Sequence, residues 1–167
     1  MVLPLNRLVD DIEISGIRQF SEKVGIIPNI IPLTLGAPDF PTPDHIKTAA
    51  KAAIDNNITN YTPNAGFLST RQAAAAYFKK KYSLDYDPLS EVVITVGATE
   101  AISLALSTVL NPGDEVLVPD PLYPGYTAPI HLAGAEMVVM DTTVTEFKVT
   151  PAMLDNYVTE KTKVLIL

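Results

Sequence analysis

The sequence contains no cysteine and no tryptophan among its 167 residues. Without cysteine, disulfide bonds, zinc–thiolate sites and thiol nucleophiles are excluded. No apolar run approaches the ~20 residues that a membrane-spanning helix needs, and the chain does not start with a basic segment followed by an apolar one. We therefore expect a soluble, cytoplasmic protein that does not enter a membrane.

Positive charge is also scarce. Twelve basic residues stand against nineteen acidic ones, which gives a net charge of −7 and a pI near 4.7. This balance opposes binding to nucleic acid or to an anionic membrane. The densest basic run, Lys79 to Lys81, lies at the end of a predicted helix, where cations offset the helix dipole. Neither His45 nor His131 has neighbours at metal-ligand spacing, so no metal site is predicted.

Apolar residues make up 47% of the sequence, enough for a real hydrophobic core. From residue 92 onward, β-branched runs alternate with helical stretches. Strands are predicted at 92–96, 115–119, 136–141 and 163–167, and helices at about 98–110, at about 123–133 and from Thr150 onward. Alternating strands and helices predict an α/β fold with right-handed crossovers and a parallel sheet.

The first half of the chain is predicted to be helical between turns. The stretch to about Ile31 resembles a helix, and a second helix is expected from Thr42, as the N-cap, to about Asp55. A third helix should follow Gly66 and end near Tyr82. We expect residues 1–45 to form an N-terminal arm and linker, and residues 46–167 to form the first part of a larger sheet domain.

The segment from Val92 to Ile102 predicts a strand that turns sharply into a helix. Gly97 permits the tight turn, and the first helical N–H groups have no acceptor within the helix. A phosphate could accept hydrogen bonds from the amides of Ala98 and Thr99 and from the Thr99 hydroxyl, at the positive end of the helix dipole. Glu100 is expected to direct its carboxylate away from such an anion. Ordinary α/β packing gives the same pattern.

Three further motifs accompany this one: LTLGAPDF at 33–40, YTPNAG at 61–66 and PDPLYPGY at 119–126. In this order and spacing, the four motifs resemble the class I (fold-type I) pyridoxal-phosphate aminotransferases. The resemblance is strongest to the aromatic-amino-acid and N-acetyl-diaminopimelate aminotransferases, and it covers nearly the whole chain. It implies a three-layer parallel-sheet domain, pyridoxal 5'-phosphate as cofactor, an amino acid and a 2-oxo acid as substrates, and a homodimer.

The resemblance also implies which residues bind the cofactor. Gly97, Ala98 and Thr99 would hold its phosphate. Tyr61 matches a tyrosine that reaches across the dimer interface toward the partner's cofactor phosphate, and this role rests wholly on the resemblance.

Tyr123 lies just beyond the strand at 115–119, on the carboxyl side of the sheet, where α/β proteins bind ligands. Its position offers a face to a flat ring, and the resemblance implies that it stacks on the pyridine ring of the cofactor. A plain structural role, as an anchor at the start of a helix, is the alternative. The preceding Asp120–Pro121 bond is predicted to be cis, because relatives turn sharply here and X–Pro bonds tolerate cis.

Two residues are candidates for substrate binding. Gly36 follows an alternating apolar segment, where a positive φ or a close backbone approach is expected, although a simple turn glycine is the alternative. The resemblance implies that Gly36 lies beside the substrate α-carboxylate. It also matches Ile17 to an apolar position of the arm that covers the substrate pocket.

The groups that complete transamination are missing. The reaction needs a lysine that forms a Schiff base with the cofactor and moves the α-proton, and none of the nine lysines fits. In the family this lysine, an Asn-Pro-x-Gly segment, an Asp and a substrate-binding Arg come later in a chain more than twice as long. We therefore expect an inactive N-terminal fragment without catalytic residues, whose four strands are separated in the family sheet by strands of the missing half.

Two other functions remain open at this stage. A pyridoxal-phosphate-dependent C–S lyase would use the same motifs. A non-catalytic, aminotransferase-like ligand-sensing domain of a regulator would be marked by a basic helix-turn-helix segment, and the sequence shows none.

Overall fold

The structure is a computed structural model, which describes residues 3–4, 6–10, 12, 16–31, 33–34 and 36–167. The chain divides into two compact units. One unit is formed by Met1–Lys23 together with Val96–Leu167, and the other by Val24–Thr95.

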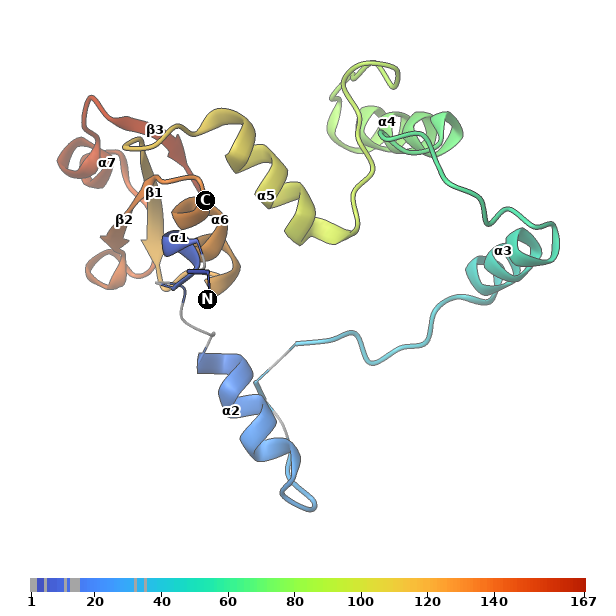
Figure 1. Ribbon diagram of the computed structural model, residues 1–167, viewed down its shortest axis with the longest axis horizontal. Coiled ribbons are helices and arrows are strands. Elements are labelled where there is room, and N and C mark those ends of the chain that lie inside the picture. The colour runs from blue at the N-terminus through green and yellow to red at the C-terminus, as the bar shows by residue number, and fades with distance from the viewer. Residues whose placement is uncertain (1–2, 5, 11, 13–15, 32, 35) are drawn as a thin grey trace. The chain divides into compact units, whose positions relative to one another are not determined.

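The first unit contains a three-stranded parallel sheet (Figure 1). Its strands are β1 (Glu115–Asp120), β2 (Glu136–Asp141) and β3 (Thr162–Leu165), in the order β2-β1-β3. Parallel neighbours need a crossover between them. The 3-10 helix η1 (Pro124–Tyr126) and α6 (Thr127–Leu132) join β1 to β2, and η2 (Thr143–Thr145) and α7 (Pro151–Tyr157) join β2 to β3.

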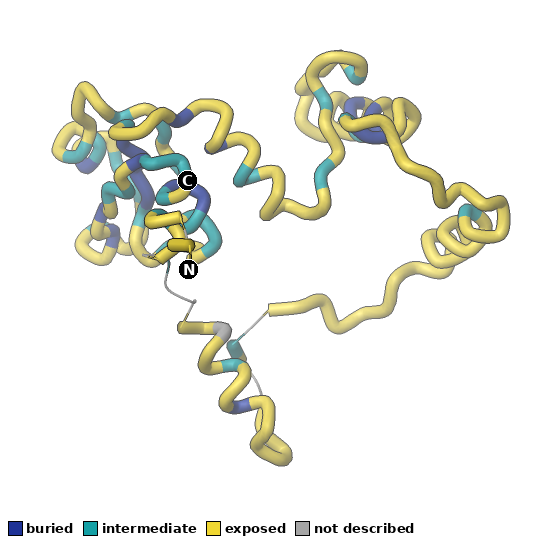
Figure 2. The backbone as a smooth tube through the Cα atoms, in the orientation of Figure 1, coloured by how far each residue is buried: buried dark blue, intermediate teal, exposed yellow. Residues whose placement is uncertain are grey.

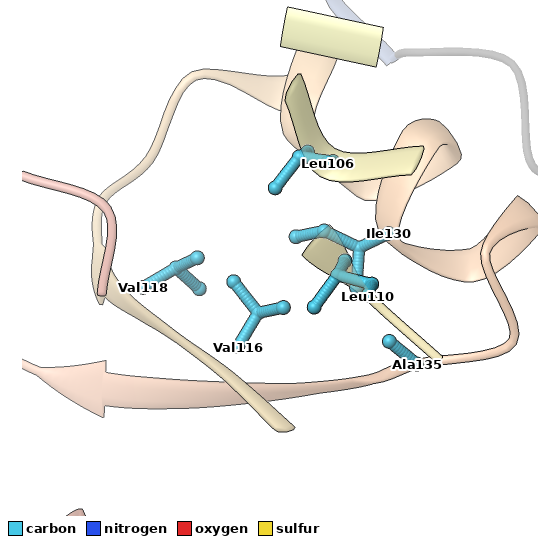
Figure 3. Close-up of a cluster of buried hydrophobic side chains, with 6 residues drawn as sticks. All are labelled: Leu106, Leu110, Val116, Val118, Ile130 and Ala135. Carbon is cyan, nitrogen blue, oxygen red and sulfur yellow. The ribbon is translucent and has the colours of Figure 1, made fainter. Parts of the chain in front are cut away.

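The central strand β1 supplies core residues to both faces of the sheet, because successive side chains of a strand point in opposite directions. On one face, Val116 and Val118 pack with residues of α5 (Gly97–Val109), of α6 and of their connections (Figure 3); these are Leu106, Leu110, Ile130 and Ala135. On the other face, Leu117 packs with Met140 of β2 and with Met153 of α7. Helices thus cover both faces (Figure 1), which confirms the predicted α/β fold.

Hydrogen bonds of two adjacent acidic residues fix the start of β1. The buried Glu115 accepts hydrogen bonds from the hydroxyls of Thr159, at 2.6 Å, and Thr162, at 3.3 Å. Asp114 accepts a bond of 2.7 Å from the Asn111 amide and pairs with the Lys163 ammonium at 3.1 Å. The Asn111 amide and the Lys163 ammonium hold the pKa of Asp114 below its ordinary value, so this contact persists at neutral pH.

The second unit contains the helices α3 (Asp44–Asp55) and α4 (Leu68–Tyr82). All twelve residues of α3 are described and none is buried, as the yellow colour in Figure 2 shows. The guanidinium of Arg71, a buried residue of α4, donates to the carbonyl oxygens of Gly66, Pro88 and Leu89 at 2.8–3.2 Å. Arg71 thereby ties the turn before α4 to the segment after it.

The N-terminal stretch forms two helices in its described part, α1 (Arg7–Asp10) and α2 (Gly16–Gly25), where one helix to about Ile31 was expected. Helix α3 ends at Asp55 as predicted. Thr42 is not its N-cap, however: Pro43 occupies that position, and none of the described side chains caps the helix. The division into an arm at 1–45 and a domain at 46–167 stays a prediction.

The strand predicted at 92–96 is wrong: these residues have no regular structure. Among the described residues no strand lies beside them, so their N–H and C=O groups cannot join a ladder. The Ile94 amide instead donates to the carbonyl of Ala65 at 3.1 Å. Val93 and Val96 remain 60% and 90% exposed. A β-branched run is therefore not sufficient to make a strand here.

The expected separation of the other three strands is also wrong within this chain. β1 pairs directly with β2 along its whole length, from Glu115 opposite Glu136 to Asp120 opposite Asp141. It pairs with β3 on its other side. The crossovers place β2 and β3 on either side of β1, so the backbone N–H and C=O groups of the three strands pair with one another.

None of the helices that the structure describes is long and apolar enough to cross a membrane.

Replacing Leu117 with Ala should lower the free energy of unfolding by about 2–5 kcal/mol, because the side chain is fully buried and its removal leaves a cavity. Urea unfolding followed by circular dichroism measures this. Leu167→Ala is the matched control: Leu167 is 83% exposed, so its loss should change stability by no more than about 0.5 kcal/mol. Equal effects of the two substitutions would contradict the described core.

Candidate functional site

The N-terminus of α5 offers backbone donors to solvent. Gly97 has a φ of +80°, which only glycine adopts without strain, and it turns the chain into the helix. Gly97, Ala98 and Thr99 are all exposed. The first amides of an α-helix have no acceptor within it, and this 13-residue helix directs the positive end of its dipole to the same place. These features can hold an anion.

Glu100 contributes a negative charge to this helix start. Its carboxylate accepts a hydrogen bond from the amide of Val96, the N-cap residue. The carboxylate thus folds back onto the helix start, where the anion was expected, and does not point away from that position. The N–H groups at the helix start and the helix dipole attract a carboxylate just as they attract any other anion. The carboxylate stabilises the first turn and opposes, by repulsion, a second anion bound beside it.

The carboxyl end of β1 holds the second part of the candidate site. The Asp120–Pro121 peptide bond is cis, as predicted. The carbonyl oxygen of Asp120 accepts hydrogen bonds from the hydroxyl of Thr142, at 2.6 Å, and from its amide, at 3.3 Å. Thr142 is only 2% exposed, and no motif in the sequence marks it. These bonds join the ends of β1 and β2 at the edge of the sheet where parallel sheets bind ligands.

Tyr123 presents its ring to solvent next to this edge. The side chain is 54% exposed, and its ring makes an edge-to-face contact with Tyr126, with centroids 5.4 Å apart and planes at 86°. The ring lies over Gly125: a Cβ added there would come within 2.2 Å of the ring atom Cε1 of Tyr123. Gly125 therefore allows this ring position. The Pro-Gly pair after Tyr123 is the sequence signal for this ring position.

The other predicted site residues are described one by one. Tyr61, in the second unit, is fully exposed. Ile17 lies in α2 and is 44% exposed. A Cβ added at Gly36 would meet no described atom within 4 Å, so the described residues make no close approach to its backbone. The functional roles of these three residues stay predictions.

Several lysines have partners of their own. Lys47, Lys79, Lys148 and Lys163 form ion pairs of 2.7–3.3 Å with acidic residues. The ammonium of Lys81 donates to the hydroxyl of Tyr77 at 2.8 Å, and bonds to the hydroxyls of Tyr77 and Tyr82 raise the pKa of Lys81. A raised pKa favours the charged form of Lys81, which is the wrong form for a nucleophilic amine. Among the described residues, no group of three or more His, Cys, Asp or Glu could hold a metal ion.

Residues 28–167 match the protein-family model for aminotransferase class I and II. The chain is 52% identical over 163 residues to a probable N-acetyl-LL-diaminopimelate aminotransferase of Bacillus subtilis, covering 98% of this chain and 42% of that protein. It is 42% identical over 154 residues to aromatic-amino-acid aminotransferase 2 of Thermococcus litoralis, covering 92% of this chain and 40% of that protein.

Solved structures give the same result. The structure of the aspartate aminotransferase from Thermus thermophilus with maleate matches with a TM-score of 0.92 at 32% identity, over 99% of this chain and 44% of that chain. The aromatic aminotransferase from Pyrococcus horikoshii matches with a TM-score of 0.78 at 38% identity, over 87% of this chain and 40% of that one. The chain thus spans about two fifths of the length of the curated relatives it matches, 42% and 40% for the two named above.

The charge of Glu100 gives a test of the anion site. Glu100→Gln should tighten binding of inorganic phosphate to the helix start by about two- to fivefold, because an exposed like charge next to the anion is removed. Isothermal titration calorimetry at low ionic strength measures this. Glu160→Gln removes the same charge at another exposed position and should leave the affinity unchanged. Weaker phosphate binding after Glu100→Gln would contradict the placement of the anion.

Proposed function

The chain belongs to the class I and II aminotransferase family, and we propose that it forms the N-terminal portion of an enzyme that transfers an amino group from an L-amino acid to a 2-oxo acid through pyridoxal phosphate. One observation carries this proposal. A single unit of the structure holds both an exposed helix N-terminus at Gly97–Thr99 and an exposed aromatic face at Tyr123. The cofactor needs both: an anion site and a flat apolar surface.

The chemistry of these groups fits the cofactor. The phosphate is an acceptor of hydrogen bonds, which suits the amides of Ala98 and Thr99 and the Thr99 hydroxyl. The pyridine ring is flat and aromatic, which suits the half-exposed ring of Tyr123. The negative charge of Glu100 opposes the phosphate, and its bond to the Val96 amide keeps the carboxylate at the helix start.

The residues assigned to the site bind or orient the cofactor and the substrate. The helix start at Gly97–Thr99 fixes the phosphate end, and Tyr123 fixes the plane of the ring, so that together they define its orientation. Gly36 and Ile17 are assigned to the substrate, at its α-carboxylate and over its pocket. Tyr61 is assigned to the cofactor phosphate of the partner subunit in a homodimer. The bound cofactor supplies an electron-withdrawing ring that stabilises negative charge on the substrate carbon.

The substrate class follows from the relatives. The 52% identity to a probable N-acetyl-LL-diaminopimelate aminotransferase supports an acylated diamino acid as one substrate. Aromatic amino acids are the second candidate, supported by 42% identity. No observation on the described residues favours a C–S lyase or a ligand-sensing domain. The absence of cysteine and the acidic pI suit a cytoplasmic enzyme.

The 167-residue chain alone should have no aminotransferase activity. No lysine of the sequence fits the role of the amine that moves the α-proton, and positioned groups set the rate of such a reaction. Turnover assays with pyridoxal phosphate and with acylated diamino, aromatic and acidic donors measure this. Turnover above that of free cofactor would show that the chain supplies its own base.

The stacking role of Tyr123 predicts a contrast between two substitutions in a full-length protein that contains this segment. Tyr123→Ala should weaken cofactor binding by about 1–3 kcal/mol, as other losses of ring stacking do. Tyr123→Phe keeps the ring and should be nearly silent. Absorbance titration with pyridoxal phosphate measures both affinities.

Gly125→Ala gives an independent check of the same role. The added Cβ displaces the Tyr123 ring without removing it, so the affinity should fall in the same direction as in Tyr123→Ala. Equal losses in Tyr123→Phe and Tyr123→Ala would assign the effect to the hydroxyl and refute stacking.

A further inference from the structure

A pocket of about 330 Å³ lies beyond the carboxyl end of β2, between the β2–α7 connection and α7. Its lining residues are Asp141, Val144, Thr145, Thr150, Ala152, Met153, Asn156 and Tyr157. None of the residues assigned to the cofactor or the substrate lines it. The pocket is at the small end of the range for small-molecule sites, so it suits a ligand of few atoms.

The pocket combines apolar walls with one charge. Met153 is buried, and Val144 and Ala152 add apolar surface. Among the lining residues, Asp141 is the one with a formal charge. Its oxygen Oδ1 accepts hydrogen bonds from the amide of Thr143, at 2.9 Å, and from its hydroxyl, at 2.5 Å. These bonds lower the pKa of Asp141 and keep the carboxylate ionised at neutral pH.

Two polar neighbours donate to the backbone of the protein itself. Thr145 donates its hydroxyl to the Lys148 carbonyl at 2.6 Å, and Asn156 donates its side-chain amide to the Ala152 carbonyl at 3.2 Å. The basic side chain of the same connection, Lys148, pairs with Glu146 at 3.3 Å. A ligand that complements the Asp141 carboxylate and the apolar walls carries a positive charge and an apolar stem.

We propose that this pocket binds a primary ammonium group on a short aliphatic stem, with the ammonium at Asp141 and the stem against Met153, Val144 and Ala152. An ammonium fits better than a guanidinium. Both bonds described for the Asp141 carboxylate go to Oδ1, so Oδ2 offers a single-point contact, whereas a guanidinium favours two parallel bonds to both oxygens. A free alkylamine and a lysine side chain share this chemistry.

The test uses the 167-residue chain labelled with ¹⁵N, titrated with n-butylamine at neutral pH and low salt. Amide shifts should saturate within residues 141–157. Butan-1-ol has the same stem without the charge and should bind about tenfold more weakly or not at all. Butylguanidine should bind more weakly than butylamine. Nα-acetyl-lysine N-methylamide distinguishes a lysine side chain from a free amine as the ligand. If it binds as tightly as butylamine, the ligand is a lysine side chain; if it does not bind, the ligand is a free amine.

Three variants make the test decisive. Asp141→Asn keeps an oxygen that can accept the Thr143 bonds and should weaken butylamine binding about tenfold. Ala152→Leu fills the pocket without touching the carboxylate and should also abolish the shifts. Asp155→Asn removes the same charge from an exposed position of α7 outside the lining and should bind as the parent does. Binding that survives both Asp141→Asn and Ala152→Leu, or no saturable binding to the parent, overturns the proposal.

Discussion

The complete burial of β1 is the constraint on which the sheet-bearing unit depends. Val116, Leu117 and Val118 are each 0% exposed, and burying one such side chain contributes about 1.5–3 kcal/mol. Because consecutive residues face opposite ways, burial of all three requires apolar cover on both sides of the sheet. Helices α5 and α6 supply it on one side and α7 on the other. The layered architecture follows from these three residues.

That architecture places the candidate site. The carboxyl end of β1 leads directly through the Asp120–Pro121 bond to Tyr123, and the hydroxyl and amide of Thr142 hold Asp120 at the end of β2. On the face of the sheet that α6 also covers, Leu106 and Leu110 pack against β1 and anchor the C-terminal half of α5, whereas the N-terminal turn of α5 stays exposed. One end of α5 therefore contributes to the core, and the other end provides the N–H donors for an anion. Binding groups sit on elements whose position is set by buried side chains elsewhere.

The sequence alone predicted the elements that depend on neighbouring residues in the chain. The strands at Glu115–Asp120 and Glu136–Asp141 and the N-cap of α7, where Thr150 accepts a bond from the Met153 amide, agree with its pattern. It failed where the outcome depends on a distant partner. Residues 92–96 have strand-forming side chains, but among the described residues no strand lies beside them, and Thr142 owes its role to the Asp120 carbonyl, which only the fold brings within reach. Glu100 differs, because its partner, the Val96 amide, is only four residues away. Gly125 matters because of the Tyr123 ring above it, a contact that no periodicity reveals.

The central claim is that the exposed start of α5 is an anion site in the same unit as a ring-binding surface at Tyr123. Its most direct test is an NMR titration of the ¹⁵N-labelled chain, first with inorganic phosphate and then with pyridoxal phosphate. The account predicts that phosphate shifts the amides of Ala98 and Thr99 before any others, and that pyridoxal phosphate in addition shifts the ring resonances of Tyr123. Phosphate-induced shifts that leave Ala98 and Thr99 unchanged would contradict it.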